Sequence, residues 1–310
     1  MKTDRLTNID LIKFISIIIM VIDHIILISM KDSLSAGQIF FFTYVPLCQM
    51  GFLLSSGYLL AYKFDRKKIF KYLGRVAMFI IVFVAMTWLS KEELLSSGSI
   101  LINFALSTLL GLFFLYRRRI KALLVFMGAL FGLDIILQIL LANNINVLNT
   151  WLADYPYPVN SYSLYFLLGI ILFVYQDRLK ILFQKKFMPW LVGLILVFYS
   201  SIFFSNIHIN IHGSYQHLPW LLLTTAIVGI FFFFAWERIK LPRGLDWVVK
   251  KTAEALLYIY VLHYIVLFGW LADKDLSYFV LSLVVLLIAI VAIGLKFITK
   301  QIRYKFSNKL

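Results

Sequence analysis

The sequence predicts an all-α integral membrane protein, a bundle of about ten transmembrane helices with both termini in the cytoplasm. Three observations support this: the composition, the recurrence of long apolar runs and the distribution of basic residues. Hydrophobic residues make up 62 % of the 310 residues and charged residues 15 %, with a mean hydropathy of +0.90. A soluble protein lies nearer to half apolar and a quarter charged. Apolar runs of about 20 residues have the length needed to cross roughly 30 Å of hydrocarbon.

The apolar runs are separated only by short segments, so residues 1–310 are expected to form one transmembrane domain. The first run follows Lys2 and Arg5, as a secretion signal would. It is too long for a signal and lacks a small-residue cleavage site, so we expect it to remain in the mature protein. The expected spans are 9–30, 39–62, 72–90, 98–116, 120–142, 161–176, 187–205, 218–236, 253–271 and 276–298.

Basic residues are distributed unevenly between alternate loops. With a cytoplasmic N-terminus, only Lys31, Lys91 and Lys274 of the 30 Lys and Arg residues fall on the outer side. This positive-inside bias predicts a multi-pass protein of the plasma (inner) membrane with both termini inside. Attraction of the basic loops to anionic lipid accounts for the net charge of +15, so no nucleic acid partner is expected.

The first span contains four ionisable residues, Asp10, Lys13, Asp23 and His24. Lys13 and His24 are 11 residues apart, which returns to within about 20° of the same helix face and places them roughly 16.5 Å apart along the axis. Asp10 precedes Lys13 by one turn, whereas Asp23 points about 100° away from His24. Ionisable groups inside a span are costly and usually face the bundle interior or a water-filled cavity.

These residues have a functional and a structural interpretation. A histidine can act as general base towards a hydroxyl, because its ordinary pKa is near 6.5. A cation three turns below it could hold a phosphate-bearing donor whose reactive end reaches the histidine. In the structural alternative, Lys13 extends to the inner interface and pairs with Asp10, and His24 and Asp23 serve packing.

Four stretches together resemble the membrane acyltransferase family 3. The first is residues 8–24, in which Lys13, ten intervening residues and His24 occupy the places of the family's Arg and His. The others are "VPLCQMGFLLSSGYLLAYKF" (45–64), "RKKIFKYLGRV" (66–76) and "LLYIYVLHYIVL" (256–267). The sequence departs from the family pattern in having Lys13 for Arg, and Tyr72 and Arg75 in place of paired arginines. The Asp-His pair at 23–24 is also similar to pilin-acetylating proteins and heparan-type glucosaminide acetyltransferases.

The resemblance implies an acyltransferase, O-acetyl transfer being the favoured reaction. Acetyl-CoA or another acyl-CoA would be the co-substrate, and the acceptor a hydroxyl or amine of an envelope glycan or lipid-linked sugar. His24 would be the catalytic base, by direct attack or through an acyl-histidine. The expected binding residues for the CoA phosphates are Lys13, Arg66, Lys67, Lys68, Lys71 and Arg75.

Further residues are candidates for the same site. Asp134 lies within a span and is expected to orient His24 or bind an acceptor hydroxyl, unless it only bonds to a neighbouring helix. Together with Asp23 it completes the set of candidate catalytic residues. His263 is a candidate substrate contact, with packing or hydrogen bonding as the alternative. The remaining candidate substrate contacts are Ser56, Tyr58, Trp151 and Tyr157, the last two by stacking on sugar or else as part of an aromatic belt at the membrane surface.

The histidine and cysteine content bears on metal binding and on disulfide bonds. The segment 206–217 contains His208, His212 and His217 in an alternating pattern, but without the ligand spacing of a zinc site, so no metal is expected. The single cysteine, Cys48, excludes an internal disulfide bond. The oligomeric state, a homodimer included, stays open.

The rival function is a transporter or flippase of an envelope precursor, but the chain lacks the paired Gly- or Pro-broken helices of inverted repeats.

Overall fold

A computed structural model of the protein describes residues 7–29, 36–90, 99–142, 159–205, 219–237, 239–271, 274 and 276–307. Within these ranges all regular secondary structure is helical, which satisfies the backbone N–H and C=O groups inside each segment as a lipid environment requires. The helices are α1 (Thr7–Ser29), α2 (Ala36–Lys63), η1 (Arg66–Lys68), α3 (Ile69–Ser90), α4 (Ser99–Arg117), α5 (Ile120–Ala142), α6 (Val159–Val174), α7 (Gln176–Phe183), α8 (Met188–Ser205), α9 (Pro219–Trp236), α10 (Arg243–Tyr264), the π-helix η3 (Ile265–Trp270) and α11 (Tyr278–Ser307).

Each predicted span overlaps one of the longer helices, although 253–271 also covers the π-helix η3 and 161–176 reaches the start of α7. Two of the predicted loops were wrong in part. The segment after α6, expected as an inner loop, forms the short helix α7. Helix α10 begins at Arg243, ten residues before the predicted span 253–271. Its first two turns mix charged and apolar residues and contain the ion pair between Lys250 Nζ and Asp246 Oδ2 at 2.6 Å. A hydropathy pattern does not predict that these turns are helical, because they lie before the apolar residues of the span.

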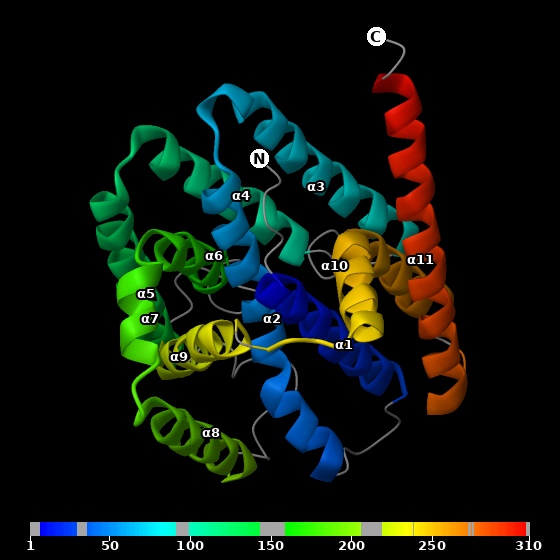
Figure 1. The fold of residues 1–310 in the computed structure, drawn as a ribbon. Helices are drawn as coiled ribbons and strands as arrows, with labels where there is room; N and C mark the ends of the chain where they lie inside the picture. Colours follow the sequence, from blue (N-terminus) through cyan, green and yellow to red (C-terminus); the bar gives the residue numbers. More distant parts are fainter. Residues whose placement is uncertain are drawn as a thin grey trace.

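Helix α2 lies in the middle of the bundle, where it packs against α1, α4, α6, α8 and α9 (Figure 1). Its closest partner is α6. Gly57 of α2 faces the backbone of Phe166, and Gly169 of α6 faces the backbone of Leu54. Small residues at such positions allow two membrane helices to approach closely. The α2–α6 pair therefore forms a very close helix contact, the most extensive among the described helices, with Tyr162 of α6 donating a hydrogen bond to Gln49 of α2.

The buried side chains form two groups that meet at α1 and α2. Ile9 and Ile12, near the start of α1, belong to a group built with α2, α4, α5, α6 and α9. Ile17 and Ile25, further along α1, belong to a second group with α3, α10, η3 and α11. Consequently α1 packs on α9 at its start and on α10 at its end, and this places its polar residues in two different environments.

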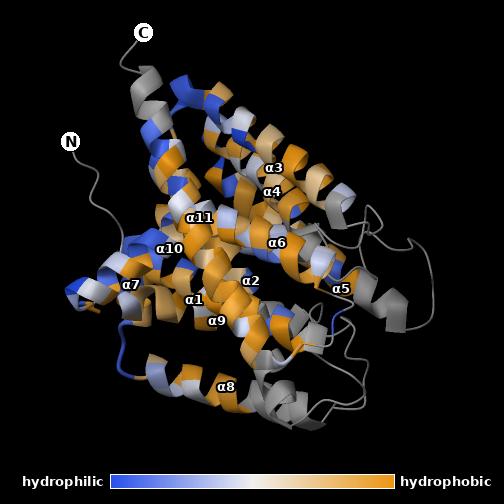
Figure 2. Ribbon diagram, turned by 90° about the vertical axis from the view of Figure 1, so that its right-hand side faces the viewer, coloured by the Kyte–Doolittle hydropathy of each residue, from blue (hydrophilic) through white to orange (hydrophobic). Residues whose placement is uncertain are grey.

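Large apolar side chains also cover the outside of the bundle. Phe70 and Trp88 of α3 are 83 % and 80 % exposed, and Trp190 of α8 is 83 % exposed. In Figure 2 the helices through the middle of the molecule are coloured mostly as hydrophobic residues, with hydrophilic residues along α7, at the start of α10 and toward the end of α11. Many exposed large apolar side chains are what a lipid-embedded protein presents.

Three helical stretches in the described part of the chain are both long and apolar enough to cross a membrane: Arg66–Trp88, Arg243–Trp270 and Phe279–Gln301. Four further apolar helices are shorter: Leu101–Arg117, Tyr162–Val174, Met188–Val197 and Leu223–Trp236. The molecule is thus a membrane protein with several spanning helices. The count of ten spans and the cytoplasmic placement of both termini remain predictions from the sequence.

Candidate active site

The centre of the candidate site is a hydrogen-bonded pair of histidines from α1 and α10. His24 Nδ1 lies 2.9 Å from His263 Nε2, and both rings are buried. His263 Nδ1 lies 2.8 Å from the carbonyl oxygen of Ile259, one turn earlier in α10. The two residues are 239 positions apart in the chain, and the packing of α1 against α10 brings them together.

Aromatic rings enclose His24 on the side of α10 and η3. The ring of Phe268 meets it edge to face at 5.0 Å between centroids, and the ring of Tyr264 does so at 6.2 Å. Phe268 belongs to the π-helix η3, which begins two residues after His263. Short π-helical stretches within α-helices occur frequently at functional sites. Here the π-helix sets the position of the Phe268 ring that contacts His24, a feature that the sequence did not predict.

The two other candidate catalytic residues, Asp23 and Asp134, are not hydrogen-bonded to this histidine pair within the described residues. Asp23 is buried on a neighbouring face of α1, about 100° from His24. Asp134 is only 1 % exposed in α5, and that helix packs against α4, α6 and α9. Hydrogen bonding within the described residues links His24 to His263 and to neither aspartate.

Lys13 is half-buried on α1, on the same helical stripe as His24. Because α1 is one continuous helix from Thr7 to Ser29, the predicted axial separation of roughly 16.5 Å holds. Lys13 also takes part in an interaction of its own within the structure, so its charge is not isolated. The helix therefore presents a cation and a buried histidine along one side at a fixed spacing.

The five predicted phosphate-binding cations of the segment 66–75 are exposed on η1 and the first two turns of α3. Arg66 donates to the carbonyl oxygen of Tyr116 and lies over its ring, 5.2 Å from the centroid. Arg75 lies 5.8 Å from the centroid of Tyr72. Among the described residues, Lys67 and Lys71 have neither an ion-pair partner nor a cation–π contact. These two side chains are thus the ones best able to take up an anion.

Asp65, in the connection between α2 and η1, organises the start of this basic segment. Its carboxylate accepts a hydrogen bond from the backbone N–H of Lys67 at 3.0 Å and pairs with Lys68 Nζ at 3.0 Å. The bond from the Lys68 side chain, followed by that from the Lys67 backbone, lowers the pKa of the Asp65 carboxyl. Asp65 is exposed and stays ionised near neutral pH, so it neutralises Lys68 and caps η1.

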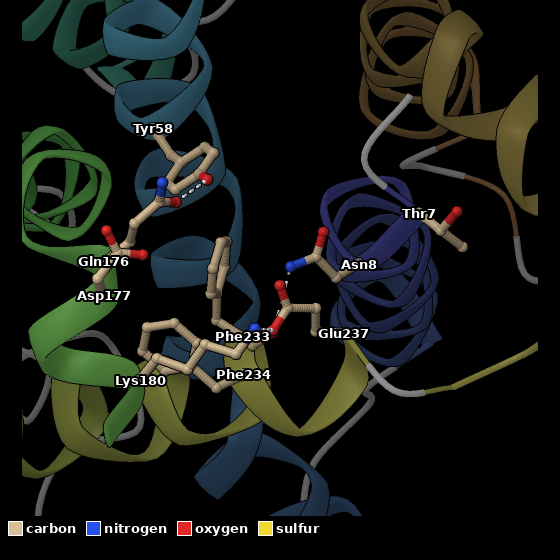
Figure 3. Close-up of a pocket in the computed structure, with 9 residues that line it drawn as sticks. All are labelled: Thr7, Asn8, Tyr58, Gln176, Asp177, Lys180, Phe233, Phe234 and Glu237. Carbon is tan, nitrogen blue, oxygen red and sulfur yellow. Dashed lines mark hydrogen bonds and ion pairs between the residues drawn. The ribbon is translucent and has the colours of Figure 1, made fainter. Parts of the chain in front are cut away.

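A second polar site lies where α1 begins, between α2, α7 and α9, and Figure 3 shows its lining side chains. It is a pocket of about 280 Å³ that includes Tyr58, Gln176 and the ion pair of Lys180 with Glu237. Tyr58 donates to Gln176 Oε1 at 2.7 Å, and Asn8 Nδ2 donates to the carbonyl oxygen of Phe233 at 3.3 Å. Asn8 and His24 are 16 residues apart on α1, about 24 Å. Tyr58 is therefore not placed beside His24.

Of the remaining candidate residues, only Ser56 lies in the described part of the chain. Ser56 is half-buried in α2. Trp151 and Tyr157 lie outside the described residues, as do His208, His212 and His217. No group of three or more His, Cys, Asp or Glu side chains able to hold a metal occurs in the part of the chain that the structure describes.

An imidazole held at one ring nitrogen can accept or donate a proton at its other nitrogen when a reacting group lies within hydrogen-bond distance. The positions of His24 and His263 within apolar runs were visible in the sequence, but their pairing was not. Asn8 and Gln176 were missed, because single amides in or beside apolar runs carry no recognisable pattern.

Comparison with known proteins bears on this arrangement. A search of curated proteins and a search of solved structures each gave no match. A family model described as an acyltransferase domain matches residues 99–299, more than half of the chain. The matched range includes Asp134 and His263, and it begins after α3, so Lys13 and His24 precede it. The helical membrane architecture agrees with this match, and the chain belongs to the membrane acyltransferase family 3.

Proposed function

We propose that this protein moves an acyl group, acetyl in the first instance, from cytoplasmic acyl-CoA to a hydroxyl or amine of an envelope glycan or lipid-linked sugar. Family membership supports acyl transfer in a membrane. The observation that carries the finer proposal is the buried, hydrogen-bonded His24 at a fixed distance from Lys13 on one continuous helix. This spacing is comparable with the length of a pantetheine arm.

In the proposed reaction His24 acts as general base. Its free ring nitrogen removes the proton of the acceptor hydroxyl as the oxygen attacks the thioester carbonyl. The tetrahedral intermediate expels the CoA thiolate, the proton on His24 passes to that sulfur, and the products are an ester and free CoA. Burial of His24 among aromatic rings excludes water, which would otherwise compete as acceptor.

The donor would be held by cations on two elements. Lys13 lies on the same face of α1 as His24, whereas the exposed Lys67 and Lys71 lie on η1 and α3. Helix α3 packs mainly against α4 and η3 and is not among the main partners of α1, so these cations would contact different phosphate groups. Several cations acting on a polyanion give more affinity than one.

Comparing the envelope glycans of cells with and without the gene by mass spectrometry tests the function as a whole. Loss of an acyl substituent in cells without the gene, restored by the wild-type chain, is the expected result. A strain that carries the His24→Ala chain at the same membrane level is the control. Identical acyl content in all strains would overturn the proposal.

Lys13→Ala is expected to weaken acetyl-CoA binding about 10-fold or more, because a charge-assisted contact contributes about 1.5–3 kcal/mol. The turnover rate at saturating donor should change little, since Lys13 does not lie at the reacting atoms. Calorimetry with the purified protein measures the affinity, and Lys13→Arg is the charge-preserving control. An affinity equal to that of the wild type would count against this role.

Replacing both Lys67 and Lys71 by glutamine is expected to weaken donor binding at low salt and to flatten its salt dependence. The matched control is Lys250→Gln, because Lys250 is already paired with Asp246. Binding of acetyl-CoA is measured at two ionic strengths. If the double variant keeps both the affinity and the salt dependence of the wild type, the segment 66–75 does not bind the donor.

A further inference from the structure

The carbonyl oxygen of Ile259 determines which atom donates in each of the two hydrogen bonds that involve His263. A carbonyl oxygen can only accept, so the proton of the bond to Ile259 belongs to His263 Nδ1. A neutral imidazole carries one N–H, and His263 Nε2 is then a lone-pair acceptor. The 2.9 Å contact therefore requires that His24 Nδ1 carries a proton and donates it. In a neutral His24, Nε2 is left as the basic nitrogen.

The geometry agrees with a true in-plane hydrogen bond. The two rings are tilted by only 15°, and their centroids are 5.1 Å apart. This separation is close to the largest possible for rings whose facing nitrogens are 2.9 Å apart, so the rings lie nearly end to end. The N–H of His24 thus points along its own ring plane at the lone pair of His263, as a strong hydrogen bond requires.

The surroundings favour neutral rings in the resting state. His263 is completely buried and His24 is 8 % exposed, and transferring a charged group into such a site is costly without an ionised partner. The side chains whose rings contact the pair are Tyr260, Tyr264 and Phe268. Asp23, the neighbouring acid on α1, points to an adjacent helix face. The described contacts therefore contain no carboxylate that would hold either ring as an imidazolium.

We propose that His263 is a positioning residue that holds His24 as the Nδ1–H tautomer and so presents His24 Nε2 as the base. The anchor is the backbone of α10, because the Ile259 carbonyl fixes which nitrogen of His263 accepts. This assigns His263 a part other than substrate contact. The proposal rests on the proposed function of His24 in catalysis, but its structural half, the tautomer, can be tested without any activity.

Two variants separate positioning from mere packing. His263→Leu keeps the bulk and removes the acceptor, whereas His263→Gln can place its side-chain oxygen near the position of Nε2. His263→Leu should lose about 10–100-fold in kcat, the effect seen when a group that orients an active residue is removed, with KM for acetyl-CoA within about 2-fold of the wild type. His263→Gln should recover most of the loss. Equal rates for wild type and His263→Leu would overturn the proposal, as would equal losses in both variants.

Nitrogen NMR of the purified protein labelled only at histidine gives the independent measurement. The sequence has five histidines, and the signals of His24 are identified as those missing from His24→Gln. The expected result is a protonated Nδ1 and an unprotonated Nε2 for His24, with the Nδ1–H state reduced in His263→Leu. A wild-type spectrum with the proton of His24 on Nε2 would overturn the proposal.

The two experiments also distinguish failure of this inference from failure of the proposed function. If His24→Ala keeps full activity while the spectrum shows the Nδ1–H tautomer, the pair exists but His24 is not the base. If His24→Ala is inactive while His263→Leu is fully active, His24 is the base and positioning by His263 is wrong. A His263→Leu protein that fails to elute as a single species is replaced by His263→Gln, and the wild-type spectrum then decides.

Discussion

His24→Ala is expected to abolish acyl transfer while the protein stays folded in the membrane. A general base contributes about 10²–10⁴-fold to a rate, so the residual activity should fall to 1 % or less of the wild type. Removal of the imidazole also leaves the buried His263 Nε2 without its donor. An unpaired buried acceptor costs about 1–3 kcal/mol, so a moderate loss of stability is expected beside the loss of activity. The measurement is transfer of labelled acetyl from acetyl-CoA by the purified protein.

The control for this experiment has to reproduce the void and keep the imidazole. Ile25→Ala does so, because Ile25 is the next residue of α1, is buried, and loses a side chain of similar size. We expect Ile25→Ala to lower stability and to retain most of the activity per folded molecule. Transfer by His24→Ala at the wild-type rate would show that another group accepts the proton.

The helices could be predicted from the sequence because lipid imposes length and apolarity on each one separately. The predicted span 120–142 has the bounds of α5, and 187–205 differs from α8 by one residue. What could not be predicted lies outside the apolar stretch, such as α7, which is amphipathic and short. Its stability comes from packing on α6 and α9 rather than from a local pattern.

The relative positions of site residues could be predicted only where the residues lie on one helix. Lys13 and His24 share a helix, so their spacing follows from helix geometry alone. The partner of His24 lies 239 residues away, and only the packing of α1 on α10 identifies it. Tyr58 shows the converse, because it resembles a family position in sequence and yet belongs to the pocket with Gln176. The π-helix after Tyr264 likewise has no marker in the residues 265–270.

The second large effect is expected at the contact of α2 and α6, where Gly57→Ala should disrupt folding. A Cβ atom on Gly57 would lie 1.8 Å from the carbonyl oxygen of Phe166, and one on Gly169 would lie 2.1 Å from that of Leu54. Both obstacles are backbone atoms, which cannot move aside as a side chain can. The helices would have to separate along their whole contact, and the Tyr162–Gln49 hydrogen bond crosses the same interface.

The cost of Gly57→Ala should reach or exceed the upper end of the range of about 1–3 kcal/mol found for overpacking. Thermal unfolding in detergent should show a midpoint lowered by about 5 °C or more, or loss of the folded species on purification. The matched controls are Gly128→Ala and Gly193→Ala, where an added Cβ meets nothing within 4 Å. Since alanine is the better helix former, these controls should unfold at the wild-type temperature or above it. If Gly57→Ala unfolds together with them, α2 and α6 are not in the close contact that orders the centre of the bundle.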